Sequence, residues 1–252
     1  MRILKELIFA SLIVAGVIAA GGQAGAQEKT IKIATEGAYP PFNGKDASGA
    51  LVGFDVDIAK ALCDEMKVKC EIVAQDWDGM IPALEAKKYD AISASMSITD
   101  ERKQKIDFTN PYYSNYLRIV TKKGSGLTGP DSLKGKTVGA QRSTVAATYA
   151  EDKLGRGSTV KLYDTQTAAY SDLEAGRLDA LVSDVYPAFD WLKDKPGFEF
   201  VGEKIDLNDK IGIAIRKGDK ELADAFNKAL KTIRDNGTYA KLNAKYFPFD
   251  IY

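Results

Sequence analysis

The sequence contains no histidine, and this absence removes several kinds of catalysis from consideration. Histidine is the commonest general base at neutral pH, so neither a Ser-His-Asp nor a Cys-His mechanism is available to this chain. Cysteine is scarce too, since the chain contains two, Cys63 and Cys70. Two thiolates without an imidazole make a poor zinc site, so we expect no bound metal.

Long apolar runs are equally scarce, and the one that exists lies at the N-terminus. Arg2 and Lys5 form a short basic start, residues 7–20 are largely apolar, and residues 24–26 read Ala-Gly-Ala. This combination is typical of a cleaved signal peptide, and the run is shorter than the ~20 residues of a membrane-spanning helix. We expect residues 1–26 to be removed and the mature protein to be periplasmic; a retained membrane anchor is the alternative.

An excess of charge of either sign is missing as well. The chain has 35 basic and 35 acidic side chains, and it keeps 33 and 34 of them without residues 1–26. Nucleic-acid binding needs a basic face, so the composition predicts no nucleic-acid partner. The mature length of about 226 residues is enough to bury one good core or two modest ones.

The spacing of the two cysteines predicts a disulfide. Cys63 and Cys70 stand seven positions apart in a chain that we expect to be exported. A close pair of cysteines in an oxidising compartment is interpreted first as a disulfide, and metal binding is the weaker alternative.

One glycine-containing stretch matches a nucleotide-binding motif only in part. Gly124, Gly126 and Gly129 fit G-x-G-x-x-G, but Pro130 and Asp131 follow where a long helix should begin. A flexible surface loop explains these glycines better. We therefore expect no nucleotide and no other cofactor.

Strand-like and helix-like segments alternate along the mature chain. Such alternation indicates parallel sheets with helices on their faces. The order occurs twice, which suggests two α/β lobes, although one larger sheet would give the same pattern. The predicted strands are 30–35, 70–75, 90–95, 137–141, 159–164 and 179–184, and the predicted helices are 54–66, 80–87, 144–153, 167–175 and two near the C-terminus.

Polar and aromatic residues stand where several of these strands end. In parallel α/β sheets, ligands bind beyond the carboxyl ends of the strands. Each residue alone has an ordinary explanation: Trp77 as a core aromatic, Arg102 as a solvated charge, Asp184 as a helix cap. Their shared placement favours a common binding site. The group comprises Glu36, Trp77, Ser95, Ser97, Arg102 and Asp184.

Seven longer stretches are distributed over nearly the whole mature chain. They are GFDVDIAKALC (53–63), WDGMIPAL (77–84), SITDERK (97–103), IDFTNPYY (106–113), LKGKTVG (133–139), AGRLDA (175–180) and NGTYAKLNAKYF (236–247). In this order they resemble the polar amino-acid family of periplasmic solute-binding proteins that serve ATP-driven importers. The resemblance is greatest to the lysine/arginine/ornithine and histidine receptors, and the opine receptors are related.

The resemblance implies an α/β fold of two lobes that close on a solute. Each lobe would be a mostly parallel sheet with flanking helices, and two strands would form the hinge. Lobe I would comprise residues 27–112 and 213–252, and lobe II residues 117–208. The hinge strands would be residues 113–116 and 209–212.

By the same resemblance, five residues would hold the α-groups of an amino acid. Arg102 would bind the α-carboxylate, for which its planar guanidinium is suited. Ser97 and backbone N–H groups near Thr144 would assist it. Asp184 and Ser95 would accept hydrogen bonds from the α-ammonium.

The ligand side chain would meet three further residues. Tyr39 and Trp77 would enclose its aliphatic part, and Glu36 would meet its far end. Glu36 favours a cationic side chain, because a buried carboxylate needs a charged partner. An acidic residue also stands here in the glutamine receptors, which limits this argument.

Three departures from the family pattern bear on specificity. Ala94 stands where the basic-amino-acid receptors have a serine, and Val145 and Ala146 stand where they have a polar pair. Arg142 stands near a family glutamine, where it would either brace its loop or meet an acidic ligand.

We therefore expect the extracytoplasmic substrate-binding component of an ABC transporter for polar, and by the Glu36 argument basic, amino acids. It would be a monomer with a membrane permease as its partner, and not an enzyme. An opine or glutamine-type ligand in the same role is one alternative. The other is a periplasmic cyclohexadienyl dehydratase-like enzyme on the same fold, with Glu36 as its general acid.

Overall fold

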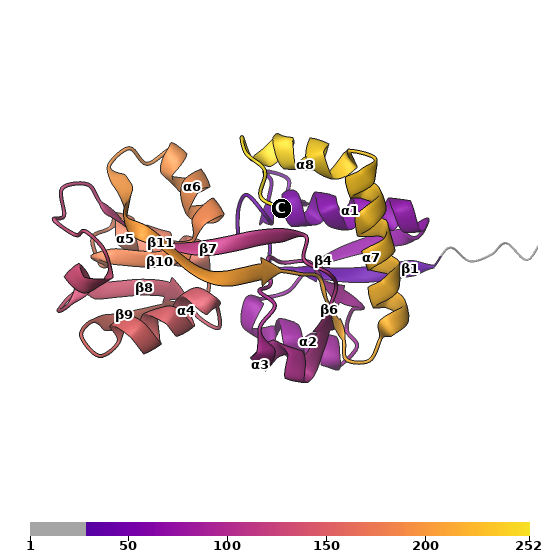
Figure 1. Ribbon diagram of the computed structural model, residues 1–252, viewed down its shortest axis with the longest axis horizontal. Coiled ribbons are helices and arrows are strands. Elements are labelled where there is room, and N and C mark those ends of the chain that lie inside the picture. Colours follow the sequence, from indigo (N-terminus) through magenta and orange to yellow (C-terminus); the bar gives the residue numbers. More distant parts are fainter. Residues whose placement is uncertain (1–28) are drawn as a thin grey trace, which may run out of the picture.

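The computed structural model describes residues 29–252, so the predicted signal peptide lies outside the described residues. Two lobes lie side by side, and each contains one five-stranded sheet with helices against it (Figure 1). The predicted fold class is confirmed, and the alternative of one larger sheet is wrong.

The first lobe is built on a sheet of strand order β4-β1-β5-β12-β6. Strands β1, β4 and β5 run parallel, whereas β12 is antiparallel to both β5 and β6. The strands are β1 (Thr30–Thr35), β4 (Lys69–Ala74), β5 (Ala91–Ile92), β6 (Ile106–Phe108) and β12 (Ala214–Arg216), and a small hairpin pairs β2 (Gly44–Lys45) with β3 (Leu51–Val52).

Five α-helices belong to this lobe, and α1 shows why the sequence folds as it does. Phe54, Ile58 and Leu62 recur every fourth residue, and all three are fully buried. Lys67 adopts the left-handed conformation directly after the helix and ends it with backbone hydrogen bonds. The helices are α1 (Phe54–Met66), α2 (Met80–Glu85), α3 (Asp100–Lys105), α7 (Lys220–Asp235) and α8 (Thr238–Tyr246).

The second lobe is built on a sheet of strand order β11-β7-β10-β8-β9. Its strands β10, β8 and β9 are parallel, and β7 is antiparallel to both β10 and β11. The elements are β7 (Tyr113–Lys122), β8 (Thr137–Gln141), α4 (Val145–Tyr149) with a π-helical continuation (Ala150–Leu154), β9 (Thr159–Tyr163), α5 (Gln166–Glu174), β10 (Ala180–Asp184), α6 (Val185–Lys193) and β11 (Phe198–Ile211).

The sheets depart in one respect from the predicted mostly parallel arrangement. Each has two parallel and two antiparallel pairings, so both sheets are mixed. The physical reason is that the chain passes between the lobes. The strand by which it enters the second lobe, β7, and the strand by which it returns to the first, β12, run against both of their neighbours.

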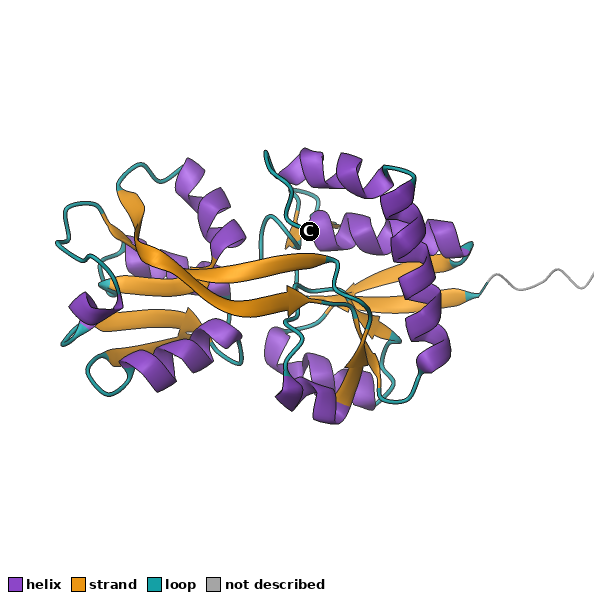
Figure 2. Cartoon of the chain, viewed as in Figure 1, coloured by secondary structure: helices purple, strands orange, loops and turns teal. Residues whose placement is uncertain are grey.

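Strands β7 and β11 pair with each other and extend from the second lobe into the first (Figure 2). Near the first lobe, Tyr113 lies opposite Ile211 and Asn115 lies opposite Asp209. The chain segment after β5 joins the same ladder, because Ser97 forms a β-bridge with Ile211. The exact lobe and hinge boundaries given above remain predictions.

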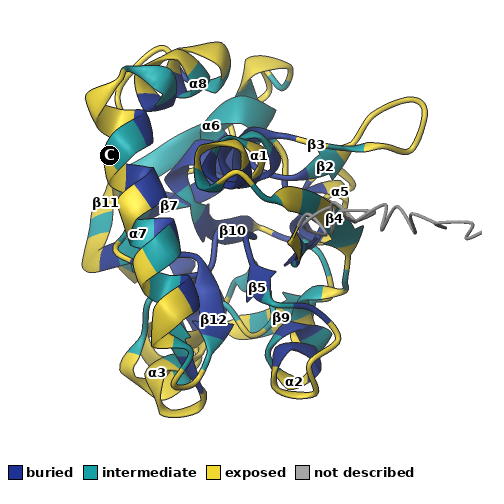
Figure 3. Cartoon of the chain, turned by 90° about the vertical axis from the view of Figure 1, so that its right-hand side faces the viewer, coloured by how far each residue is buried: buried dark blue, intermediate teal, exposed yellow. Residues whose placement is uncertain are grey.

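Buried residues lie in the strands and in α1, while the outer faces of α7 and α8 are exposed (Figure 3). The core of the first lobe also takes up Val185 and Tyr186 from the start of α6. Helix α6 is thereby held where the two lobes meet. Among residues 29–252, no helix is both long and apolar enough to cross a bilayer.

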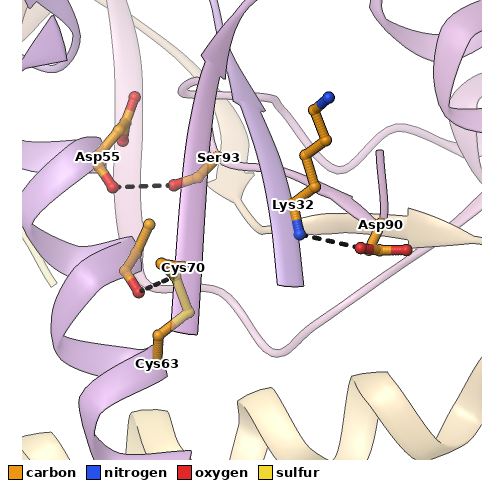
Figure 4. Close-up of a disulfide and its surroundings, with 7 residues drawn as sticks. Lys32, Asp55, Cys63, Cys70, Asp90 and Ser93 are labelled. Atoms are coloured by element: carbon orange, nitrogen blue, oxygen red, sulfur yellow. Dashed lines mark hydrogen bonds between the residues drawn. A yellow bond between two sulfur atoms is a disulfide. The ribbon is translucent and has the colours of Figure 1, made fainter. Parts of the chain in front are cut away.

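The predicted disulfide is confirmed, since Cys63 near the end of α1 is bonded to Cys70 in β4 (Figure 4). The two Cα atoms are 5.9 Å apart, within the range of protein disulfides. The bridge ties the helix to the edge strand of the first sheet, away from the carboxyl ends of β1 and β5.

Candidate ligand-binding site

A cavity between the lobes brings together all eight residues predicted to bind a ligand. It is narrow, about 20 Å³, far below the 300–1,000 Å³ of a typical small-molecule pocket. An amino acid therefore fits only if the lobes or the lining side chains move apart. The lining residues are Glu36, Tyr39, Trp77, Ala94, Ser95, Ser97, Arg102, Gln141, Thr144, Val145 and Asp184.

The sheets explain why these residues meet. Glu36 directly follows β1, and Trp77 begins a 3₁₀ turn shortly after β4. In the second lobe Gln141 ends β8 and Asp184 ends β10. The carboxyl ends of parallel strands share one edge of a sheet, and the two such edges face each other across the cavity.

Arg102 is the cation of the cavity. Thr99 caps helix α3 by accepting a hydrogen bond from the Arg102 backbone N–H (3.2 Å). The guanidinium donates to the Ser97 carbonyl (2.8 Å) and the Ser143 carbonyl (2.9 Å), and it lies over the Trp77 ring at 5.3 Å. Burial lowers the pKa of Arg102, and the nearby carboxylates of Asp209 and Asp184 oppose this shift. Arginine keeps its charge under such conditions, so the cavity holds a positive group that can pair with a carboxylate.

Asp184 faces Arg102 from the other lobe. It stands at the N-cap position of α6, yet its side chain makes no capping hydrogen bond. Its carboxylate accepts a hydrogen bond of 2.5 Å from the Tyr39 hydroxyl instead. The explanation of Asp184 as an ordinary helix cap therefore fails. Burial, and then the like charge of Asp209, raise the pKa of Asp184 to about 6.

Glu36 lies where β1 ends, and its side chain is buried. The Gln141 amide donates to its Oε1 atom (2.8 Å) and also to the Asp164 carbonyl (3.2 Å). Burial raises the pKa of Glu36 to about 7, an effect that the Gln141 hydrogen bond partly offsets and that Asp76 and Asp78 reinforce. A cation placed beside Glu36 would recover the free energy lost by desolvating its carboxylate.

The hydroxyl groups of the cavity all donate their protons to the protein. Ser95 donates to Asp55 (2.9 Å), and Ser97 donates to Asp209 (3.2 Å). Thr144 caps helix α4 by accepting from Ala147, and its hydroxyl donates to the Gln141 carbonyl (2.7 Å). A hydroxyl has one proton to donate, so these groups present lone pairs to the cavity.

Four hydrogen bonds cross the cavity from one lobe to the other. Trp77 and Arg102 of the first lobe both donate to the Ser143 carbonyl of the second, at 3.2 and 2.9 Å. The other two join Tyr39 to Asp184 and Gln141 to Glu36. A ligand that separates these groups must offer each freed donor an acceptor and each freed acceptor a donor.

Arg142 does not line the cavity, unlike Ala94 and Val145. Its guanidinium forms an ion pair with Asp164 (3.0 Å) and approaches Asp78 of the other lobe at 3.9 Å. These contacts fit a residue that braces its loop at the cavity rim.

Sequence reasoning missed Gln141 as a lining residue. It is 2 % exposed and is the last residue of β8. The rule that drew attention to Asp184, a polar residue at the carboxyl end of a parallel strand, applies to Gln141 equally well.

Comparison with known proteins gives consistent matches. Residues 31–249 match the family of bacterial extracellular solute-binding proteins, family 3. The L-arginine-binding protein of Pseudomonas aeruginosa is 48 % identical over 90 % of this chain and 91 % of its own length. The lysine/arginine/ornithine-binding periplasmic protein of Escherichia coli is 42 % identical over 99 % of both chains.

A solved structure agrees with these sequence matches. It is an ancestral arginine-binding protein bound to glutamine, and it superposes with a TM-score of 0.83 at 40 % identity. The match covers 88 % of this chain and 99 % of the other.

Proposed function

This chain belongs to the bacterial extracellular solute-binding proteins of family 3, and we propose that it captures a cationic L-amino acid between its lobes. In this role it is the periplasmic receptor of an ABC importer, and it delivers its amino acid to a membrane permease. The relatives named for arginine and for lysine, arginine and ornithine support this role.

One observation carries the amino-acid part of the proposal: a cation and a carboxylate face each other across one cavity. Arg102 from the first lobe suits an α-carboxylate, since guanidinium and carboxylate form paired, charge-assisted hydrogen bonds. Asp184 from the second lobe suits an α-ammonium. A zwitterion contacts both lobes at once, so it binds the closed arrangement best and shifts the population toward it.

The cationic part of the proposal rests on Glu36. Tyr39 and Trp77 line the cavity and can pack on methylene groups of any ligand, so they do not select its charge. The buried Glu36 carboxylate favours an ammonium or guanidinium group, and the Gln141 side chain offers an amide oxygen beside it once its amide group turns. A neutral amide would compete best when Glu36 is protonated. That is why a glutamine-type ligand is the first alternative to lysine, arginine, ornithine or histidine.

An enzymatic role on the same site is the second candidate, and one observation favours it. The pKa of Glu36 is raised to about 7, which suits a general acid. However, Glu36 already bonds to Gln141, and the opposed Arg102 and Asp184 suit retention of a zwitterion. We therefore propose binding without catalysis. Formation of phenylpyruvate from prephenate, or of phenylalanine from arogenate, would overturn this.

Isothermal titration of the purified mature protein tests the proposed function. The panel comprises lysine, arginine, ornithine, histidine, glutamine, glutamate, octopine and nopaline, because these cover the basic, neutral, acidic and opine alternatives. We expect a basic amino acid to bind most tightly. A preference for glutamine, glutamate or an opine over every basic ligand would refute the cationic assignment and leave the receptor role in place.

A further inference from the structure

Asp209 lies behind the cavity and does not line it, yet it is connected to the site. It belongs to β11, close to where this strand reaches the first lobe, and it is 7 % exposed. Its Oδ2 atom accepts hydrogen bonds from the Ser97 hydroxyl (3.2 Å) and from the Asn115 amide (2.9 Å). Ser97 does line the cavity. A buried carboxylate thus holds a group of the site from a strand that links the lobes.

The backbone fixes this contact. Ser97 forms a β-bridge with Ile211, and the Ile98 N–H donates to the Lys210 carbonyl (2.8 Å). The segment that carries Ser97 is therefore paired with the strand that carries Asp209. Asn115, which lies opposite Asp209 in the ladder, holds the carboxylate from the other side. This pairing holds the Ser97 hydroxyl within hydrogen-bond distance of the Asp209 carboxylate.

The direction of this hydrogen bond decides what Ser97 can offer a ligand. A hydroxyl has one proton and two lone pairs, and an ionised carboxylate can only accept. While the Ser97 proton points to Asp209, the cavity meets the lone pairs of Ser97. Lone pairs suit a donor such as an ammonium group and repel a carboxylate oxygen.

We propose that Asp209 is a positioning residue that makes Ser97 an acceptor, so that the site selects ligands carrying an α-ammonium group. The inference rests on the proposed function. Through Asp209, the lone pairs of the Ser97 hydroxyl are held toward the α-ammonium group. The parallel contact of Ser95 with buried Asp55 gives the neighbouring hydroxyl the same polarity.

The test compares two ligands that differ only at this group: L-arginine, and 5-guanidinopentanoate, which is arginine without its α-ammonium. Titrations use the wild type, Asp209→Asn, Ser97→Ala and the double variant. Asp206→Asn is the matched control, because Asp206 is an exposed aspartate of the same strand that bonds to Lys204 (3.0 Å). Circular dichroism reports the fold of each variant.

We expect Asp209→Asn to weaken arginine binding about tenfold or more, the scale of a hydrogen bond to a charged group. Binding of 5-guanidinopentanoate should change less than about twofold. In the Ser97→Ala background, the same Asp209→Asn change should weaken arginine binding about threefold or less, because residues that act through one another are not additive. Asp206→Asn should leave both affinities unchanged.

Equal losses for the two ligands, or an undiminished loss in the Ser97→Ala background, would overturn the role of Asp209. These results differ from failure of the proposed function. In that case the wild type itself would bind no amino acid of the panel, or would bind glutamine, glutamate or an opine more tightly than every basic ligand. Because each variant is judged by the ratio of two affinities, a partly destabilised Asp209→Asn protein still gives a decisive answer.

Discussion

Replacing Glu36 with glutamine should change both the strength and the pH dependence of binding. Glutamine has nearly the same shape, so the packing of Tyr39 and Trp77 around the ligand is retained. The substitution removes the charge that we assign to the ligand cation. Loss of a hydrogen bond between charged groups costs about 1.5–3 kcal/mol, so arginine should bind roughly 10- to 150-fold more weakly at pH 8.

The pH dependence follows from the direction of the pKa shift. Burial raises the pKa of Glu36 to about 7, and a bound cation lowers it again. Below pH 7 the free protein carries a proton that binding must release, so affinity for arginine falls as the pH drops through 7. The loss is about tenfold at pH 6, or about 1.4 kcal/mol. The Glu36→Gln variant lacks this proton and should keep its affinity down to pH 6, where protonation of Asp184 begins to weaken binding.

Calorimetric titrations between pH 5 and pH 8, in two buffers of different ionisation enthalpy, would measure both the affinity and the protons released. Glu71→Gln is a suitable control, since Glu71 is exposed on β4 and pairs with Lys32. The reasoning is refuted if wild-type affinity for arginine is flat from pH 8 to pH 6. It is refuted equally if Glu36→Gln has the same profile as the wild type.

Three other predictions address the pair Arg102 and Asp184, the disulfide and the motion of the lobes. Arg102→Ala should weaken binding by about 2–5 kcal/mol, roughly thirtyfold to several thousandfold, because it leaves a desolvated carboxylate without a partner. Asp184→Asn should also weaken ligand affinity by a large factor. For either variant, a loss of affinity below about threefold by calorimetry would show that the residue does not hold the α-groups. Replacing Cys63 and Cys70 by serine should cost about 2–3 kcal/mol of unfolding free energy in denaturant titrations and leave ligand affinity intact, since the bridge lies away from the cavity. Because the lobes must separate to admit a ligand, we expect the free protein to be open in solution. Saturating ligand should therefore reduce the radius of gyration in small-angle scattering, and an unchanged profile would contradict closure on the ligand.

Local sequence patterns predicted most of the parallel strands and several helices, but they missed α6 (Val185–Lys193), and the strand predicted at 90–95 is limited to Ala91–Ile92. The strands Thr30–Thr35 and Thr137–Gln141 and the helix Phe54–Met66 have the predicted bounds. Each carries a clear signal within its own residues, either a compact apolar run between polar flanks or an apolar residue every fourth position. These patterns predict the fold because the apolar residues that form them are buried against a neighbouring element.

The antiparallel strand β11 was harder to predict because its own residues show no strand-like apolar pattern, and pairing with a distant strand stabilises it. β11 (Phe198–Ile211) contains a charged stretch whose residues are largely exposed, so it shows no apolar alternation. Its partner is β7, about ninety positions away in the chain. The contact between Asp209 and Ser97 depends on a further long-range pairing, the bridge between Ser97 and Ile211, and nothing in either local stretch indicates it.

Part of the site was predictable from one rule, which is that ligands bind at the carboxyl ends of parallel strands. Residues at the carboxyl ends of parallel strands, such as Glu36 and Asp184, were found by position, and the same rule would have found Gln141. What the rule could not give is the partner of each group. That Tyr39 bonds to Asp184, and that Gln141 bonds to Glu36, depends on how two separate lobes face each other.

The most direct test of the central claim is a paired titration of the wild type with L-arginine and L-citrulline at pH 8. The two ligands share their α-groups and their methylene chain, and they differ in a charged guanidinium against a neutral ureido group. We expect arginine to bind at least tenfold more tightly than citrulline, because Glu36 is ionised at this pH and pairs with the guanidinium. Equal affinities, or tighter binding of citrulline, would contradict the claim that this receptor selects a cationic amino acid.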